Sequence, residues 1–320
     1  MRRLTLEEFS DCRDAFDEAV ARTPEIATFC SSSLWQATAR EWLHPTGLDS
    51  DETLLIEDGG NWLLLSERKG QRVFYSFEAA WMFGCPLIGD PVACVDLLCT
   101  AGRKFLQSPY GFCFGGIRRG SVLHLALQER KEEWRRYEEF PATDCMEIDL
   151  SGGFDAWLDR RSKKFRKSIR QIRLPEDLSF IEETEEDAEH LLERILAVQK
   201  RTYKWREGTD IFQSGDYLPF YRALLTRLRK SGNLRLLFAR QDGGDLAYIF
   251  GGLQGTIYRG FQMSYVEKVK ELGLGNALQI RNLQARAAEG VTCYDLGMHA
   301  TYKERWADSR HEYLGVFLVR

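Results

Sequence analysis

Three strand-like runs followed by a glycine-bearing helix start are the feature that most constrains the fold of this 320-residue chain. Short glycine turns separate the runs Leu234–Arg240, Leu246–Leu253 and Thr256–Tyr265, which predicts an antiparallel sheet. The segment Lys270–Ala277 (KELGLGNA) follows and opens an amphipathic stretch that continues to about Glu289. Strand, glycine loop and helix N-terminus in this order predict a phosphate seat, because unpaired N–H groups and the helix dipole face the loop.

The rest of the chain alternates helical and strand patterns. In the first half we expect two helical pieces within residues 1–45, strands at 53–57, 62–68, 72–78, Gly111–Ile117 and 145–150, and a helix after Pro91. In the second half we expect a basic helix at 157–174, a strand at 178–182, helices opening at Thr184–Asp187 and Tyr217, and strands at Thr292–Leu296 and Tyr313–Val319. The predicted class is α/β (α+β), with a mixed, mostly antiparallel sheet flanked by helices. Two halves of similar content suggest tandem domains at residues 1–150 and 151–320.

Composition indicates a globular protein without a metal centre. Hydrophobic residues make up 44% of the chain and charged residues 29%. No run approaches the roughly 20 apolar residues of a membrane span, and the N-terminus lacks the apolar core of a signal peptide. Eight cysteines without a C-x-x-C pair and five histidines without ligand spacing lead us to expect reduced thiols, a cytoplasmic protein and no metal. The net charge of −4 argues against a dedicated nucleic-acid binder.

Two motifs give the second half a family resemblance. Lys270–Ala277 is similar to the pyrophosphate signature of GNAT acyltransferases (Gln or Arg, two residues, Gly, one residue, then Gly or Ala), with lysine in the first place. Tyr294–Gly297 (YDLG) followed by Tyr302–Trp306 (YKERW) resembles the closing motif of the CelD/BcsL, or BioF-like, acetyltransferase subgroup. FemABX aminoacyl transferases carry a related aromatic–lysine pair. The resemblance covers about residues 150–310 and implies a GNAT fold, with a degenerate GNAT-like domain over residues 1–150.

The resemblance also implies acetyl-CoA or another acyl-CoA as co-substrate, and a set of site residues. The candidate catalytic residues, for oxyanion stabilisation and proton transfer, are Lys303, Asp295, Tyr302 and Tyr265. The candidate CoA-binding residues are Gln262, Lys270, Gly273, Leu274, Gly275, Asn276 and Ala277. The candidate acceptor-binding residues are Trp205, Arg206 and His299. In GNAT enzymes the acyl carbonyl is polarised by main-chain N–H groups of the splayed strand before the loop, which here corresponds to residues 262–265.

The basic helix at 157–174 admits three readings. Between Arg160 and Arg173 it carries eight cations and no acid. It can be a solvated face, a surface for an anionic acceptor or tRNA, or a helix lying on an anionic membrane. The sequence leaves these alternatives open.

These inferences together predict an acyl-CoA-dependent N- or O-acyltransferase. It would pass the acyl group directly to an amine or hydroxyl of a small-molecule, glycan or peptide acceptor, and family association connects it with envelope polysaccharides. A covalent intermediate is disfavoured, because Cys293 has no histidine at a helpful spacing. Two rivals stay open: a FemABX-like transferase that uses aminoacyl-tRNA, and a non-catalytic GNAT scaffold. Neither the acceptor nor the oligomeric state follows from the sequence.

Overall fold

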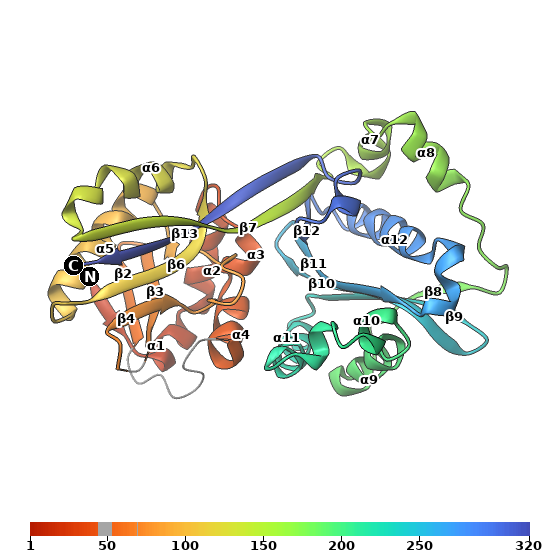
Figure 1. Ribbon diagram of the computed structural model, residues 1–320, viewed down its shortest axis with the longest axis horizontal. Helices are drawn as coiled ribbons and strands as arrows, with labels where there is room; N and C mark the ends of the chain where they lie inside the picture. The colour runs from red at the N-terminus through yellow and green to blue at the C-terminus, as the bar shows by residue number, and fades with distance from the viewer. Residues whose placement is uncertain (44–52, 69) are drawn as a thin grey trace. The chain divides into compact units, whose positions relative to one another are not determined.

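The computed structural model describes residues 1–43, 53–68 and 70–320, which divide into two compact units (Figure 1). Unit 1 contains Met1–Asp144 and His311–Arg320, and unit 2 contains Cys145–Arg310. The predicted mixed α/β class, with mostly antiparallel strands flanked by helices, is confirmed. The C-terminal residues after Arg310, which the sequence boundary at 150 assigns to the second domain, lie in unit 1. Residues 44 and 45 of the predicted N-terminal helical region lie outside the described residues.

Unit 1 is built on strands in the order β1-β2-β3-β4-β6-β13-β7. Strand β5 pairs with β3, and β4 and β6 run parallel, joined through the helix α5. The strands are β1 (Arg2–Leu4), β2 (Thr53–Asp58), β3 (Asn61–Arg68), β4 (Val73–Ser76), β5 (Leu87–Ile88), β6 (Gly111–Arg118), β7 (Arg136–Asp149) and β13 (Ser309–Val319). The helices are α1 (Leu6–Asp11), α2 (Arg13–Arg22), α3 (Thr28–Ser31), α4 (Ser33–Leu43), α5 (Pro91–Phe105), α6 (Val122–Glu129) and the short 3-10 helix η2 (Lys131–Glu133).

Unit 2 has the strand order β7-β12-β11-β10-β9-β8. Strands β8 to β11 are antiparallel, whereas β11 and β12 run parallel with α12 as their crossover. The strands are β8 (Ser179–Glu182), β9 (Leu234–Gln241), β10 (Gly244–Gln254), β11 (Ile257–Tyr265) and β12 (Cys293–Met298). The helices are α7 (Gly153–Asp159), α8 (Lys163–Arg170), α9 (Ala188–Gln199), α10 (Tyr203–Arg206), α11 (Tyr217–Lys230) and α12 (Leu274–Ala288), with 3-10 turns η3 (Ile211–Gln213), η4 (Glu267–Leu272) and η5 (Thr301–Lys303).

The two units share one topology. Each has three antiparallel strands, a helical crossover, a parallel strand, and an antiparallel strand on the far side of that strand. In unit 1 these are β2-β3-β4, α5, β6 and β13, and in unit 2 they are β9-β10-β11, α12, β12 and β7. The outer strand is exchanged between the halves of the chain: β7 follows β6 in sequence but pairs with β12, and β13 follows β12 but pairs with β6. This common order is what a tandem arrangement predicts.

The basic helix predicted at 157–174 is two helices instead of one. Ser162 begins α8 as its N-cap, with its hydroxyl accepting a hydrogen bond from the Phe165 N–H at 3.2 Å. The break lets Arg161 Nη1 donate to the carbonyl oxygens of Trp306 and Ala307, at 3.1 and 2.8 Å. Side-chain bonding to a distant loop therefore overrides the local helical pattern.

A second helix start also differs from its prediction. The motif Thr184–Asp187 suggested a cap at its first residue, but Asp187 is the N-cap of α9 and accepts hydrogen bonds from the N–H groups of Glu189 and His190, both at 3.0 Å. An aspartate directly before the helix outcompetes a threonine three residues earlier. Among the described residues, no helix has both the length and the apolar character needed to cross a membrane.

Candidate functional site

An opening between β11 and β12 forms the centre of the candidate site in unit 2. Parallel pairing of the two strands ends at Arg259↔Asp295. At this level β11 carries one extra residue, Phe261, relative to β10, and β12 shifts register against β7 between Asp295 and Gly297. Such bulges bend and twist a strand, so the two strands separate. Within the described part of the chain, no strand consequently pairs with the edge of residues 260–265 that faces β12.

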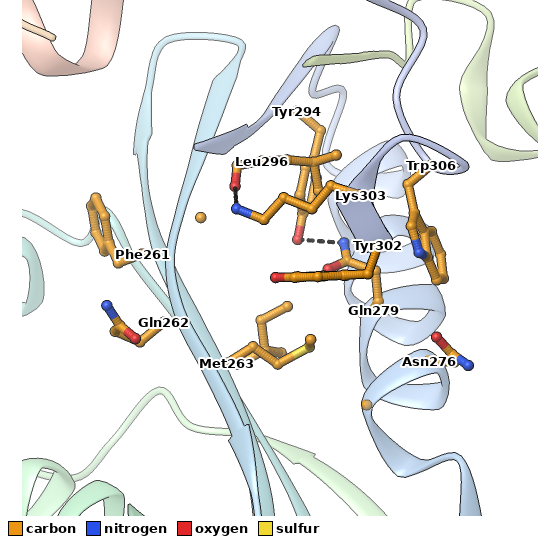
Figure 2. Close-up of a pocket in the computed structure, with 13 residues that line it drawn as sticks. Phe261, Gln262, Met263, Asn276, Gln279, Tyr294, Leu296, Tyr302, Lys303 and Trp306 are labelled. Carbon is orange, nitrogen blue, oxygen red and sulfur yellow. Dashed lines mark hydrogen bonds between the residues drawn. The ribbon is translucent and has the colours of Figure 1, made fainter. Parts of the chain in front are cut away.

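A narrow pocket of about 70 Å³ occupies this opening (Figure 2). One wall is β11, a second is β12, and α12 and the η5 region close the remaining sides. The residues that line it are Ile249, Gly260, Phe261, Gln262, Met263, Gly275, Asn276, Gln279, Tyr294, Leu296, Tyr302, Lys303 and Trp306. We call it the inner pocket. Figure 2 shows Lys303 and Tyr302 reaching from η5 into the space between β11 and α12.

Lys303 brings a cationic side chain to the inner pocket. Its Nζ donates hydrogen bonds to the carbonyl oxygens of Leu296 at 2.7 Å and Met298 at 2.8 Å. Burial, together with the nearby Arg259 guanidinium, lowers the pKa of Lys303 to about 8. Because an ammonium group has three N–H bonds, one remains after these two contacts. Lys303 is therefore a cation at neutral pH that can donate a hydrogen bond, or give up its proton, near pH 8.

Tyr294 supplies a second polar group on β12. Its hydroxyl accepts hydrogen bonds from Gln279 Nε2 at 2.9 Å and Asn282 Nδ2 at 2.6 Å. Burial raises the pKa of Tyr294 well above its ordinary value. This phenol stays neutral, and its two amide contacts fix α12 against β12.

A wider groove of about 660 Å³ continues from the inner pocket to the start of α12. We call it the outer groove. It shares Met263, Gly275, Asn276 and Tyr302 with the inner pocket, so the two spaces adjoin. Its other lining residues are Thr202, Tyr203, Lys204, Arg206, Glu207, Ser264, Tyr265, Glu267, Lys270, Gly273, Leu274 and Arg305.

The helix start in the outer groove has exposed N–H groups of the kind that anions accept, and we call it the anion seat. Gly273 has φ +66 and is the N-cap of α12 without a capping side chain. The N–H groups of Asn276 and Ala277 bond to the Gly273 carbonyl at 3.0 and 3.1 Å, which leaves Leu274 and Gly275 with N–H groups that have no acceptor within the helix. The predicted loop before this helix is instead the 3-10 turn η4, so the seat begins at Gly273.

Glycine at position 275 keeps the seat accessible, and Arg305 adds positive charge to it. A Cβ on Gly275 would lie 3.2 Å from Tyr265 Cε1, closer than an ordinary contact. Arg305 Nη2 donates to Asn276 Oδ1 at 2.8 Å, in the first turn of α12. The Arg305 guanidinium also lies 5.7 Å from the centre of the Phe165 ring. Arg305 is not among the site residues predicted from the sequence, although its place inside the YKERW motif is a signal for it.

Most of the sequence-predicted residues meet at these two spaces. The inner pocket contains Gln262, Gly275, Asn276, Tyr302 and Lys303, and the outer groove adds Lys270, Gly273, Leu274, Tyr265 and Arg206. Four candidates line neither space: Ala277, Asp295, Trp205 and His299.

Asp295 is held in a buried ion pair. Its Oδ2 lies 2.5 Å from Arg259 Nη1, and its Oδ1 accepts the Gly297 N–H at 2.7 Å. His299 Nε2 lies 2.9 Å from Glu304 Oε1, and the Trp205 N–H bonds to the Thr202 hydroxyl at 3.2 Å. The Asp295 and His299 side chains thus have local partners, whereas the bond of Trp205 is made by its backbone.

The described ranges show neither a cluster of metal-ligand side chains nor a Cys293 thiol that ionises readily. No group of three or more His, Cys, Asp or Glu side chains there is arranged to hold a metal ion. Burial, with nearby carboxylates, raises the pKa of Cys293 far above its ordinary value, so this thiol resists forming the nucleophilic thiolate.

Part of unit 2 matches a known protein family, and the chain resembles solved structures over nearly its whole length. The family described as acetyltransferase (GNAT) domain matches residues 159–304. A conserved protein of unknown function from Bacteroides thetaiotaomicron VPI-5482 aligns at 16% identity and TM-score 0.67, covering 99% of this chain and 98% of that one. FemX aligns at 11% identity and TM-score 0.70, covering 98% and 97%. No curated protein matches the chain.

A third solved structure, L-PGS from Bacillus licheniformis, aligns at 16% identity and TM-score 0.56, covering 94% of this chain and 90% of that one. At these identities the three structures show a shared fold over nearly the whole chain. The residues that match the acetyltransferase (GNAT) domain family lie within unit 2.

Proposed function

We propose that unit 2 is an acyl-CoA-dependent transferase that moves an acyl group directly from a thioester sulfur to an amine or hydroxyl. The observation that carries this proposal is the continuity of the two spaces. An anion seat at Gly273–Gly275 opens through shared walls into a narrow pocket that holds Lys303. A long carrier with phosphates at one end and a thioester at the other fits this sequence of environments.

The residues of the outer groove would hold the donor. Its pyrophosphate would accept hydrogen bonds from the N–H groups of Leu274 and Gly275, with Lys270 and Arg305 supplying positive charge. The amide-bearing arm would lie along the unpaired edge of β11 beyond Arg259, as an added strand does. The narrow inner pocket favours a small acyl group such as acetyl.

Lys303 would act at the thioester. The acceptor nitrogen or oxygen attacks the carbonyl carbon, and the resulting oxyanion is stabilised by the Lys303 ammonium and by main-chain N–H groups of the β11 edge. The C–S bond then breaks, its electron pair leaves with sulfur, and Lys303 protonates the thiolate. Because the pKa of Lys303 is about 8 and that of a free thiol is about 8.5, this transfer is nearly balanced. The proton lost by the acceptor passes to water in the outer groove. Water from the same groove returns a proton to Lys303.

Unit 1 offers no second donor seat of this type at its equivalent helix. Asp90 is the N-cap of α5 and accepts the Ala93 N–H at 2.9 Å, and Pro91 occupies the first helical position. A carboxylate at this end repels phosphate, and proline removes one N–H. These features support one donor site among the described residues, at the start of α12 in unit 2, with unit 1 as the degenerate copy.

The CelD/BcsL subgroup and an envelope glycan as acceptor belong to the proposal, carried by the motif resemblance. The rim of the outer groove at Tyr203, Lys204, Arg206 and Glu207 is the surface we assign to the acceptor. Trp205 and His299 would support this rim without lining it.

One rival function has a specific observation in its favour. The likeness to FemX covers 98% of this chain at a TM-score of 0.70, and FemABX enzymes take their acyl group from aminoacyl-tRNA. A FemABX-like donor would enter the same opening between β11 and β12. The third reading, a scaffold without activity, predicts binding without turnover.

Two measurements test the proposed function. Titration calorimetry with acetyl-CoA should give saturable binding that Gly275→Glu abolishes, because a carboxylate would then occupy the anion seat. Thiol release from acetyl-CoA with a panel of amines and amino sugars should show turnover that Lys303→Met removes. Absence of binding at millimolar acetyl-CoA contradicts the CoA reading, and binding without turnover supports the scaffold.

A further inference from the structure

A cationic hollow lies on the surface of α8. Its volume is about 510 Å³, and its lining residues are Lys163, Arg166, Lys167, Arg170, Gln171 and Arg173. We call it the α8 basic surface. Five of these six side chains are cations, so the hollow is suited to an anion.

Most of this positive charge is not neutralised within the protein. Arg166 pairs with Asp159 at 3.3 Å, and Arg173 Nη1 donates to the Arg170 and Ile172 carbonyl oxygens. No ion pair of Lys163, Lys167 or Arg170 occurs in the part of the chain that the structure describes. The helix concentrates like charges without acids between them, which is unfavourable unless a ligand or solvent compensates.

The apolar side of α8 is used in the core of unit 2. Phe165 is 5% exposed and packs edge-to-face on Trp306 with ring centres 5.0 Å apart. Ile169 packs against the same core cluster. The helix therefore has no apolar face left to insert into a lipid surface, which separates it from interfacial membrane helices.

The α8 basic surface begins where the outer groove ends. A Cβ placed on Gly273 would lie 3.9 Å from the Ile172 side chain. Ile172 stands between Arg170 and Arg173, and Gly273 is the first residue of the anion seat. Phe165 of α8 also contacts the Arg305 guanidinium of the outer groove, as described above. A ligand whose pyrophosphate lies at the start of α12 thus has cations immediately beyond it.

We propose that the α8 basic surface binds the 3′-phosphate of the CoA donor and so makes the transferase selective for CoA over carriers without this group. The inference rests on the proposed function. A phosphomonoester carries nearly two negative charges and accepts paired hydrogen bonds from arginine. Arg170 and Arg173, which flank the residue that touches Gly273, are the side chains we assign to it.

The test compares acetyl-CoA with 3′-dephospho-acetyl-CoA by titration calorimetry. The wild-type chain should bind acetyl-CoA at least about tenfold more tightly, since charge-assisted hydrogen bonds to one phosphate are lost in the other ligand. Arg170→Glu/Arg173→Glu should bind acetyl-CoA and the dephospho ligand with similar affinity. The matched control Lys131→Glu/Arg135→Glu changes the net charge equally at two exposed positions of unit 1 and should keep the wild-type ratio.

The outcomes separate this inference from the proposed function. Equal affinity of the wild type for both ligands, or a ratio unchanged in the Arg170/Arg173 variant, overturns the inference while leaving CoA as donor. No binding of either ligand overturns the proposed function itself. A third outcome is that the wild type binds an aminoacylated RNA hairpin and not acetyl-CoA, and that the Arg170/Arg173 variant does not bind the hairpin. This result would overturn both the inference and the proposed function, and would assign the α8 basic surface to RNA. Circular dichroism confirms that each variant is folded before its affinities are compared.

Discussion

Replacing Lys303 by methionine should remove activity and also remove a pH dependence of stability. Methionine keeps the length of the side chain but loses its charge and its bonds to the Leu296 and Met298 carbonyls. In the folded protein the pKa of Lys303 is lowered from 10.5 to about 8. Holding this charge in the inner pocket therefore costs stability that the methionine variant does not lose.

The magnitude follows from the difference in pKa. Between pH 8 and 10.5 the unfolded chain holds a proton that the folded Lys303 has released, so unfolding binds a proton and stability rises with pH. With these two pKa values, raising the pH from 7 to 9.5 should stabilise the wild type by up to about 2 kcal/mol, and by less to the extent that solvent screens a half-buried group. At pH 7 the methionine variant is relieved of a charge penalty of at most about 3.4 kcal/mol, which corresponds to the lowering of the Lys303 pKa from 10.5 to about 8. The two lost hydrogen bonds, about 1 kcal/mol each, offset more than half of this gain.

Urea unfolding of Lys303→Met and of the wild type at pH 7 and 9.5 gives the free energy of unfolding of each protein at both pH values. The difference between the two proteins at each pH isolates the contribution of Lys303. Tyrosines and cysteines that titrate in this range contribute equally to both proteins and drop out. Lys131→Met, whose side chain is 60% exposed, serves as the matched control and should show no such difference. A free energy of unfolding at pH 7 that is about 3 kcal/mol or more lower in the variant than in the wild type would refute this explanation of Lys303. A difference in free energy of unfolding between variant and wild type that is the same at both pH values would refute it as well.

The catalytic role of Lys303 has its own pH signature. The protonated ammonium is the active form in our mechanism, and its pKa is about 8. With an acceptor that is already neutral at pH 6, turnover should fall as the pH rises through about 8. An increase through the same range would instead identify Lys303 as a general base.

Three further variants test separate parts of the account. Gly273→Ala and Gly290→Ala both place a side chain at positive φ, +66 and +84. Each should lower the free energy of unfolding in urea by about 1 kcal/mol. Only Gly273→Ala should weaken acetyl-CoA binding in calorimetry. Asp295→Asn should destabilise by about 3 kcal/mol because it removes the carboxylate charge that faces the buried Arg259 guanidinium. Arg259→Met/Asp295→Leu should recover stability and activity, whereas a folded but inactive double variant would support the predicted catalytic role of Asp295. Trp306→Ala should cost about 3–5 kcal/mol by opening a cavity in the core of unit 2, and a loss under 1 kcal/mol would contradict its structural role.

The elements with strong local signals were predictable from the sequence. The strands β9, β10 and β11 lie within about three residues of their predicted bounds, because glycine turns mark both ends. The helix α6 and the first part of β7 were missed. β7 pairs through residues with no alternating pattern (RYEEFPATDCMEID), and its partner β12 is far away in the sequence. The exchange of β7 and β13 depends on such distant pairing and has no local signature.

The candidate site shows the same division between local and distant information. The glycine seat and Lys303 could be proposed from the sequence because each belongs to a short motif, and the structure brings both to two adjoining spaces. Asp295 lies in the YDLG motif as well, but its ion-pair partner Arg259 comes from another strand, so its burial could not be read from spacing. The bulge at Phe261, which opens the inner pocket, likewise leaves no side-chain pattern.

Hydrogen exchange in the presence of acetyl-CoA tests the central claim most directly. The amides of residues 260–265 on the unpaired edge of β11, and those of Leu274 and Gly275 at the start of α12, should exchange more slowly. The start of α5 in unit 1 should show no change. Protection should appear at both places of unit 2 together, because one ligand spans them. Binding of acetyl-CoA that leaves both stretches unprotected, or that protects the start of α5 instead, would contradict the assignment of the donor to this opening.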